Sequence, residues 1–327
     1  MLTPVRSKTI VVTIVTAITL LLLATPAWSW GHEGHRVVAR IAAKNLSQEA
    51  RIKIAAILQT NTAGVEEAMA GASTWPDEID KAATGTREWH FIDVPVTAPF
   101  NVAGLCVQHN CVIDQIENMR GRLLANTTGF ALLTPPNPPR PMTSQELAFL
   151  IHFVGDVHQP LHAATDGDRG GNCVELLHSL MHQDGSQTTE LHAVWDVDEV
   201  LRVFAVLGNE EATAAALFQR FKSGATVQQL SALDWARESN DLARTAVYQK
   251  LHLPNHTAPP NLCAPGIAKV DVTQSYVAGN VAVVERRLMQ AGVRLSNILN
   301  EICAGTGCLQ NPGGGRGHNP PDRLLRR

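Results

Sequence analysis

Apolar side chains recur along most of the chain at the three-to-four-residue spacing of amphipathic helices. This pattern predicts helices at Val37–Leu46, Ala50–Leu58, Val112–Leu124, Glu190–Phe204, Glu210–Phe221, Val227–Leu251 and Gln274–Ile302. Ser47 is placed to cap the second of these, since a serine hydroxyl accepts a hydrogen bond from the first helical turn. Thr143 and Glu146 form a capping box, which predicts a further helix that Pro160 ends.

Strand patterns are sparse, and the best is Cys173–His178, in a hairpin that turns near Asp184 and Gly185. Leu133–Pro141 is rich in proline and predicts a surface loop. No linker divides the helical region, so we expect one large, mainly α domain over residues 30–310 with a small β-hairpin. Residues 311–327 are rich in glycine and proline without an apolar period, which predicts a disordered tail.

The first 29 residues have the organisation of a secretory signal peptide. Arg6 and Lys8 precede an apolar run, Ile10–Ala24, and Ala27 and Ser29 form a small-residue cleavage site. The alternative, a membrane anchor, is disfavoured because fifteen residues are fewer than the ~20 that span a bilayer. Cleavage would leave a chain that begins at Trp30, with the formal charge changed from −3 to −5 by loss of two basic residues. We therefore expect a secreted or periplasmic protein without stable membrane insertion.

Six cysteines follow this segment, and an even number in an exported chain predicts disulfides. Cys106–Cys111 and Cys303–Cys308 would each close a short loop, which leaves Cys173 to pair with Cys263. The alternative, thiolate ligands of zinc, is weaker because no CxxC motif is present.

Composition and charge narrow the possible functions. Hydrophobic residues make up 45% of the chain and charged residues 17%, which excludes a disordered protein. A formal charge of −3 is not that of a protein that binds nucleic acid through a general basic surface. An anionic substrate must therefore be attracted locally, for example by bound metal.

Histidine and aspartate occur at spacings that suit metal binding. His152 and Asp156 lie four residues apart on the capped helix, so both side chains can reach one ion. His192 and Asp196 repeat this spacing. A single pair of this kind is more often a surface hydrogen bond, but both pairs have apolar neighbours and, if buried, need a partner. The further candidates are His35, Asp77, His90 and His162. Histidine and aspartate without cysteine suit zinc or a harder metal.

These residues belong to motifs that resemble a known family. The motifs are WGHEGH at Trp30–His35, WPD at Trp75–Asp77, HFID at His90–Asp93, HFVGDVHQPLH at His152–His162, GGN at Gly170–Asn172, LHAVWD at Leu191–Asp196 and WARES at Trp235–Ser239. In this order they resemble the zinc-dependent single-strand nucleases and 3′-nucleotidases of the S1/P1 type. The resemblance covers nearly the whole chain after residue 29.

The resemblance implies a mainly helical fold with three zinc ions at the bottom of a cleft. By motif position, one zinc would be held by Asp77, His90, His152 and Asp156. A second would be held by His162, His192 and Asp196. A third would be held by the amino nitrogen and carbonyl oxygen of Trp30, with His35 and with Asp156 as a bridge. Trp30 would offer a free amine only after cleavage of the signal peptide.

The implied chemistry is hydrolysis of phosphate esters in single-stranded DNA, RNA and 3′-nucleotides, with no obligate protein partner. Three Zn²⁺ and three aspartates leave a charge of about +3, which can hold a phosphate on an acidic protein. Zinc makes hydroxide available near pH ~7, and we hypothesise that Asp77 orients it. The products would carry a 5′-phosphate and a free 3′-hydroxyl.

Phe91 and Asp93 resemble the family's base pocket, where Phe91 would stack on an unpaired base. Alternatively, Phe91 is an aromatic residue of the core and Asp93 is a helix cap.

Two other functions remain open from the sequence. The first is a zinc phospholipase C, which has a related fold and metal site. In that enzyme the first histidine lies further from the N-terminal tryptophan and the last carboxylate is glutamate, whereas this chain has His35 and Asp196. The second is an exported zinc-binding protein without catalytic activity, against which Phe91 and Asp93 argue.

Overall fold

The structure is a computed structural model of the chain, and it describes residues 30–79, 81–125, 142–256, 258, 262–305 and 308. The predicted signal peptide, the loop Leu133–Pro141 and the tail 311–327 lie outside the described residues. None of the helices in the described part combines the length and hydropathy needed to cross a membrane.

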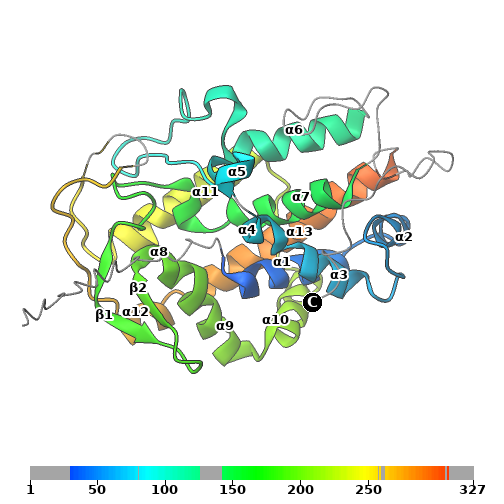
Figure 1. The fold of residues 1–327 in the computed structure, drawn as a ribbon. Coiled ribbons are helices and arrows are strands. Elements are labelled where there is room, and N and C mark those ends of the chain that lie inside the picture. The colour runs from blue at the N-terminus through cyan, green and yellow to red at the C-terminus, as the bar shows by residue number, and fades with distance from the viewer. Residues whose placement is uncertain are drawn as a thin grey trace, which may run out of the picture.

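The described chain is mainly helical, as the pattern predicts (Figure 1). The α-helices are α1 (His32–Lys44), α2 (Gln48–Ile57), α3 (Val65–Ala72), α4 (Trp75–Glu78), α5 (Lys81–Thr84), α6 (Val112–Ala125), α7 (Ser144–Asp156), α8 (Leu191–Ala193), α9 (Glu199–Leu207), α10 (Glu210–Lys222), α11 (Ala232–Leu242), α12 (Gln274–Ala278) and α13 (Val281–Ala304). Short 3₁₀ turns are η1 (Arg87–His90), η2 (Val107–His109) and η3 (Pro160–Ala163). Two π-helical turns are η4 (Val194–Asp198) and η5 (Ala243–Tyr248).

Helices α1, α7 and α13 pack together in the middle of the molecule (Figure 1). Helix α7 is mostly apolar, and its residues from Glu146 to Asp156 are all buried. A helix of this kind belongs inside a large core. Its start is fixed as predicted, because the Thr143 hydroxyl accepts from the Glu146 amide while the Glu146 carboxylate accepts from the Thr143 amide. The central helix α7 can therefore hold polar side chains in a rigid setting.

The predicted hairpin is also present. Strands β1 (Glu175–Met181) and β2 (Gln187–Glu190) pair antiparallel, with Glu175 opposite Glu190 and Met181 opposite Gln187. A bulge lies between Glu175 and Leu180. The hairpin ends directly before α8, so it brings His192 to the inside of the fold.

Several helix boundaries differ from the prediction. Helix α7 ends at Asp156 rather than at Pro160, because a residue before proline is pushed out of the α region and Gln159 has an extended backbone. The predicted helix Val227–Leu251 begins only at Ala232, where Ser231 and Asp234 form a capping box. The predicted helix Gln274–Ile302 is broken into α12 and α13 at Gly279 and Asn280. Helices α3, α4 and α5 were not predicted, because four to eight residues carry little periodicity.

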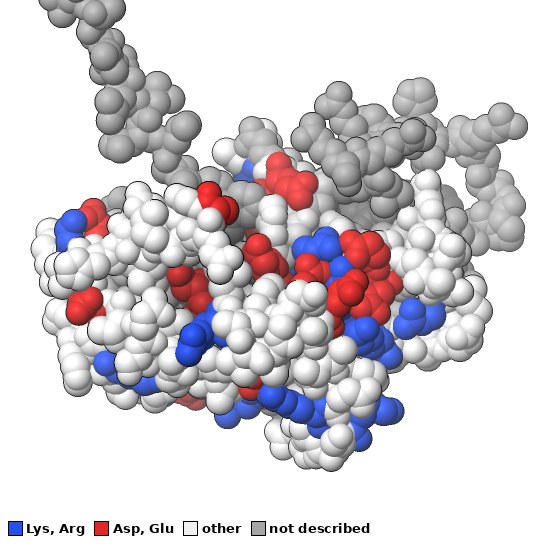
Figure 2. Space-filling view, turned by 90° about the horizontal axis from the view of Figure 1, so that it is seen from below, with Lys and Arg blue, Asp and Glu red and all other residues white. Residues whose placement is uncertain are grey.

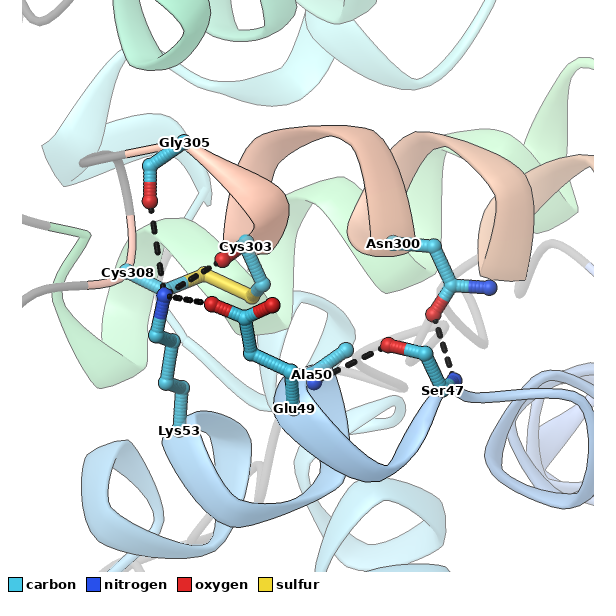
Figure 3. Close-up of a disulfide and its surroundings, with 8 residues drawn as sticks. All are labelled: Ser47, Glu49, Ala50, Lys53, Asn300, Cys303, Gly305 and Cys308. Atoms are coloured by element: carbon cyan, nitrogen blue, oxygen red, sulfur yellow. Dashed lines mark hydrogen bonds and ion pairs between the residues drawn. A yellow bond between two sulfur atoms is a disulfide. The ribbon is translucent and has the colours of Figure 1, made fainter.

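All three predicted disulfides form: Cys106–Cys111, Cys173–Cys263 and Cys303–Cys308. The last lies where α13 ends against α2 (Figure 3). There Lys53 donates to the carbonyl oxygen of Cys303 at 2.6 Å and to Glu49 at 2.7 Å. Ser47, the predicted cap of α2, accepts from Ala50, and its own amide donates to Asn300. These contacts fix the C-terminal end of α13 to α2.

Acidic and basic side chains lie next to one another on the face shown in Figure 2. Arg36 and Arg40 of α1 form ion pairs with Glu67 of α3 and Glu210 of α10. These ion pairs join α1 to α3 and α10.

Candidate metal centre

The predicted ligands gather in two adjacent buried clusters. The five-residue cluster contains His35 of α1, Asp77 of α4, His90 of η1, and His152 and Asp156 of α7. The three-residue cluster contains His162 of η3, His192 of α8 and Asp196 of η4. Each of these residues is at most 8% exposed. The two clusters are joined through the backbone, because the His90 carbonyl oxygen lies 2.8 Å from Nδ1 of His162.

Asp156 lies at the centre of the five-residue cluster. Its Oδ1 is 3.2 Å from Nε2 of His35, and its Oδ2 is 3.0 Å from Nδ1 of His90. Oδ2 also lies 3.4 Å from Nε2 of His152. The two oxygens of one carboxylate thus face different histidines, which is the arrangement that a bridging ligand needs.

Asp77 reaches the same cluster from the opposite side. Its Oδ1 lies 3.5 Å from Nε2 of His152 and 3.7 Å from Nδ1 of His90. Lys81, four residues further on, forms an ion pair with the same oxygen at 2.6 Å. Oδ2 of Asp77 is buried and has no hydrogen-bond partner among the described residues.

Backbone carbonyls fix the orientation of three of the histidine rings. Nδ1 of His152 lies 2.7 Å from the Ser73 oxygen, and Nδ1 of His192 lies 2.6 Å from the Gly170 oxygen. Nδ1 of His162 is held by His90 in the same way. A carbonyl oxygen only accepts, so each Nδ1 must carry the proton and each neutral ring presents the lone pair of Nε2 to its cluster.

This arrangement passes a test for a metal site. Nε2 of His162 and Nε2 of His192 are 3.2 Å apart, and neither carries a proton to share when both rings are neutral. Oδ2 of Asp196 lies 3.3 Å from Nε2 of His192 and lacks a hydrogen-bond donor among the described residues. Three buried acceptors that face one another repel unless a cation lies between them. Imidazole nitrogen and carboxylate oxygen, with carbonyls behind the rings, is the donor set that zinc takes in proteins.

Burial shifts the pKa values of several histidines and aspartates in the two clusters. Burial lowers the pKa of His192 to about 4, and burial followed by the charge of His152 holds the pKa of His35 well below its ordinary value. Burial raises the pKa of Asp156 and of Asp196 well above the ordinary value. Burial opposes ionisation of Asp77 too, yet His152, His90 and Lys81 hold its pKa well below the usual range. Burial likewise lowers the pKa of His90 and His162. His35, His90, His162 and His192 are therefore neutral, which is the form that binds metal.

A close approach of α1 to α7 places His35. The rings of His35 and His152 are stacked, with centroids 3.9 Å apart. A Cβ at Gly155 would lie 2.7 Å from Nδ1 of His35, so only glycine fits between them. Trp30, the predicted backbone ligand, precedes α1 and is fully buried. Its indole Nε1 has no hydrogen-bond partner in the part of the chain that the structure describes.

Gln159 is a site residue that the sequence reasoning missed. Its Nε2 donates to Oδ1 of Asp196 at 2.7 Å, and its Oε1 accepts from the Leu161 amide. One buried side chain thus links the turn that carries His162 to the carboxylate of Asp196. Lys81 was missed as well. Each lies within four residues of a predicted ligand in the sequence, Lys81 after Asp77 and Gln159 before His162, and this proximity could have pointed to them.

Phe91 and Asp93 follow His90 directly and are half-buried beside the clusters. Burial, together with the charge of Asp168, raises the pKa of Asp93 to about 6. Neither residue is fully enclosed.

Two other sets of residues lie apart from the clusters. Cys106, Cys111 and Asp114 are close together, but the two cysteines form a disulfide and offer no thiolate. His158 lies between α7 and α13, with Nε2 2.8 Å from Arg294 and its ring against Trp235.

Comparison with known proteins shows which family the chain belongs to. The sequence profile of the S1/P1 nuclease family matches residues 30–304. The chain is 28% identical to Endonuclease 3 of Arabidopsis thaliana, over 88% of this chain and 94% of the relative. It is 26% identical to Nuclease P1 of Penicillium citrinum, over 84% and 97% of the two chains. Identity to Nuclease S1 of Aspergillus oryzae is also 26%, over 87% and 95%. The resemblance is confirmed, and the chain belongs to the S1/P1 nuclease family, a family of hydrolytic nucleases.

Proposed function

We propose that this nuclease is a secreted zinc enzyme that hydrolyses single-stranded DNA and RNA to 5′-phosphorylated products and also removes the phosphate of 3′-nucleotides. The observation that carries the proposal is the pair of buried clusters, in which carbonyl-held imidazoles and carboxylates face one another. Bound zinc supplies hydroxide near neutral pH and positive charge opposite the phosphate.

The residues of the two clusters would bind metal, and one of them would also orient the attacking water. His35, His90 and His152 with Asp77 and Asp156 would hold metal in the five-residue cluster, and His162, His192 and Asp196 in the other. Asp77 has a second use, because its buried Oδ2 lacks a donor among the described residues. That oxygen can accept a hydrogen bond from the attacking water and so orient it toward phosphorus.

The rim of the site accounts for the preference for single strands. Phe91 is exposed enough to stack on a base, a contact worth ~1–3 kcal/mol and tolerant of sequence. The Asp93 carboxylate can accept hydrogen bonds from the edge of the same base. A base in a duplex has its edge occupied by its partner and its faces covered by neighbours, so it cannot enter.

Maturation would complete the site. Trp30 lies two residues before the start of α1, the helix that carries His35, and removal of residues 1–29 would give it a free amine. The three disulfides support export, because such bridges persist in oxidising compartments.

The test compares Asp156→Ala with the wild type in the mature form. We expect loss of zinc, measured by elemental analysis, together with at least a hundredfold loss of cleavage of single-stranded DNA. Asp114→Ala, which removes an aspartate from a surface pair with His109, is the matched control. Full zinc content with full activity in Asp156→Ala would contradict the proposal.

A further inference from the structure

The loop between η3 and β1 holds an arginine in an unusual backbone conformation. Arg169 has a φ of 58°, in the left-handed region that L-residues other than glycine, asparagine and aspartate rarely adopt. Its neighbour Gly170 has a φ of 61° and supplies the carbonyl that orients His192. Glycine would adopt this conformation without strain, so the arginine at this position directs attention to what its side chain does.

The loop holds the backbone of Arg169 firmly. The Asn172 amide and side chain both donate to the Arg169 carbonyl, at 3.3 and 2.7 Å. The preceding residue, Asp168, accepts from the buried hydroxyl of Tyr248 and, through its carbonyl, from the Cys173 amide. Cys173 is in turn bonded to Cys263. The conformation of residue 169 is therefore built into the fold.

The side chain of Arg169 carries a charge that the described residues leave unpaired. It is half-buried and makes no ion pair or hydrogen bond within the part of the chain that the structure describes. Lys81, by contrast, forms an ion pair with Asp77. The backbone places residue 169 between the base-pocket residue and the three-residue cluster. The carbonyl oxygen of its neighbour Gly170 lies 2.6 Å from Nδ1 of His192, and at the start of the loop the Thr165 amide donates to the carbonyl of Val94, which follows Asp93.

We propose that Arg169 binds the 5′-phosphate of the nucleotide whose base lies on Phe91 and Asp93 and whose 3′-phosphate reaches the metal clusters. This inference rests on the proposed function. A nucleotide bound by its base and its 3′-phosphate has one charged group left, the 5′-phosphate. Guanidinium is the side chain best suited to hold a phosphate, by paired hydrogen bonds. The enzyme would then favour nucleotides inside a strand over isolated nucleoside 3′-monophosphates.

The test uses two substrates that differ by this one group: adenosine 3′,5′-bisphosphate and adenosine 3′-monophosphate. We expect the wild type to have the lower KM for the bisphosphate. Arg169→Gly should reduce this preference about tenfold, the effect of losing one charged hydrogen-bonding pair. Arg169→Lys should retain part of it. For a single-stranded oligonucleotide, the slope of log KM against log salt should fall by ~0.7 in Arg169→Gly.

The choice of glycine separates binding from folding. Because glycine adopts positive φ freely, Arg169→Gly should have a melting temperature no lower than that of the wild type. Gln59→Gly is the matched control, since Gln59 has a φ of 54° beside α2 and should keep the wild-type preference.

Three outcomes would overturn the inference. An unchanged preference in Arg169→Gly would show that Arg169 does not contact the 5′-phosphate. Loss of zinc from this variant would assign Arg169 to the support of His192. If the zinc-loaded wild type cleaved neither substrate nor single-stranded DNA, the proposed function itself would fail, and the inference with it.

Discussion

At the scale of single residues, the site depends on groups that hold the ligands as much as on the ligands themselves. Ser73, His90 and Gly170 each use a backbone carbonyl to fix one histidine ring. Gln159 does the same for Asp196 with a side chain. Because these contacts select the tautomer and the orientation, metal affinity should be sensitive to residues that never touch the metal.

The hydrogen bond from Gln159 to Asp196 should contribute to zinc affinity. Gln159→Met keeps the buried volume but removes the donor to Asp196, so we expect zinc affinity to fall about 10- to 100-fold. The measurement is zinc retained after dialysis against a graded series of chelator concentrations. Gln115→Met is the control, because Gln115 is also buried but donates to the His109 carbonyl. Equal retention in the two variants would contradict the assignment of Gln159.

Asp93 gives a prediction about pH. With a pKa of about 6, its carboxyl is ionised at pH 7 and protonated at pH 5. If the ionised form accepts hydrogen bonds from a base edge, the KM for guanosine 3′-monophosphate should rise as the pH falls through 6. Asp93→Asn should abolish this rise, as seen in the ratio of variant to wild-type KM from pH 5 to 7. The same profile in both proteins would exclude Asp93 from base binding.

At the scale of secondary-structure elements, α9 contains a buried acid outside the clusters. Glu199 is fully buried, with Oε1 accepting from Asn280 and Oε2 without a hydrogen-bond partner among the described residues. Burial raises its pKa to about 8. A raised pKa means that the folded state binds the proton more tightly than the unfolded state. Its stabilising effect is thus complete below pH ~4.5 and lost as the pH rises through about 8.

Glu199→Gln should therefore change how stability depends on pH. The amide keeps the acceptor for Asn280 and cannot ionise, so the variant should melt several degrees above the wild type at pH 8.5 and show a smaller difference at pH 5. Melting of the zinc-loaded proteins across this range is the measurement. Glu301→Gln, in a surface ion pair with Arg120, controls for loss of a carboxylate. A larger gain at pH 5 than at pH 8.5 would contradict the sign.

Two of the disulfides close loops of very different length and should differ in how much they stabilise the fold. Cys173–Cys263 spans 90 residues and secures the loop before β1, whereas Cys106–Cys111 spans five. If the bridges act by limiting the unfolded chain, replacing both cysteines by alanine should cost about 4–5 kcal/mol for the first and about 2 kcal/mol for the second. Denaturant unfolding of the two double variants measures this, and equal losses would show that chain entropy is not the cause.

The elements also show what a sequence can predict. Long amphipathic helices with caps, such as α7 with Thr143 and Glu146, follow from local patterns. The break between α12 and α13 does not, because the apolar period continues through Gly279 and Asn280. Nor does the π-helical turn η4, which carries Asp196, since one extra residue per turn leaves little trace in a pattern.

At the scale of the whole molecule, local sequence patterns do not predict how the ligands from different helices come together. The spacing of His152 and Asp156 predicts a pair on one helix face. Nothing in the spacing places His35 or Asp77 beside that pair, because α1 and α4 reach it only through tertiary packing. The resemblance to a family supplied those residues, and the structure brings all eight side chains together.

The central claim is that these clusters hold zinc and hydrolyse phosphate esters of single-stranded nucleic acids. The most direct test is one preparation of the mature protein beginning at Trp30, analysed for zinc per chain and for cleavage of single-stranded DNA, RNA and a 3′-nucleotide, with phosphatidylcholine as the control substrate. The account predicts about three zinc ions and nuclease activity that a chelator removes and zinc restores. Cleavage of the lipid alone, zinc without turnover, or activity without zinc would contradict it.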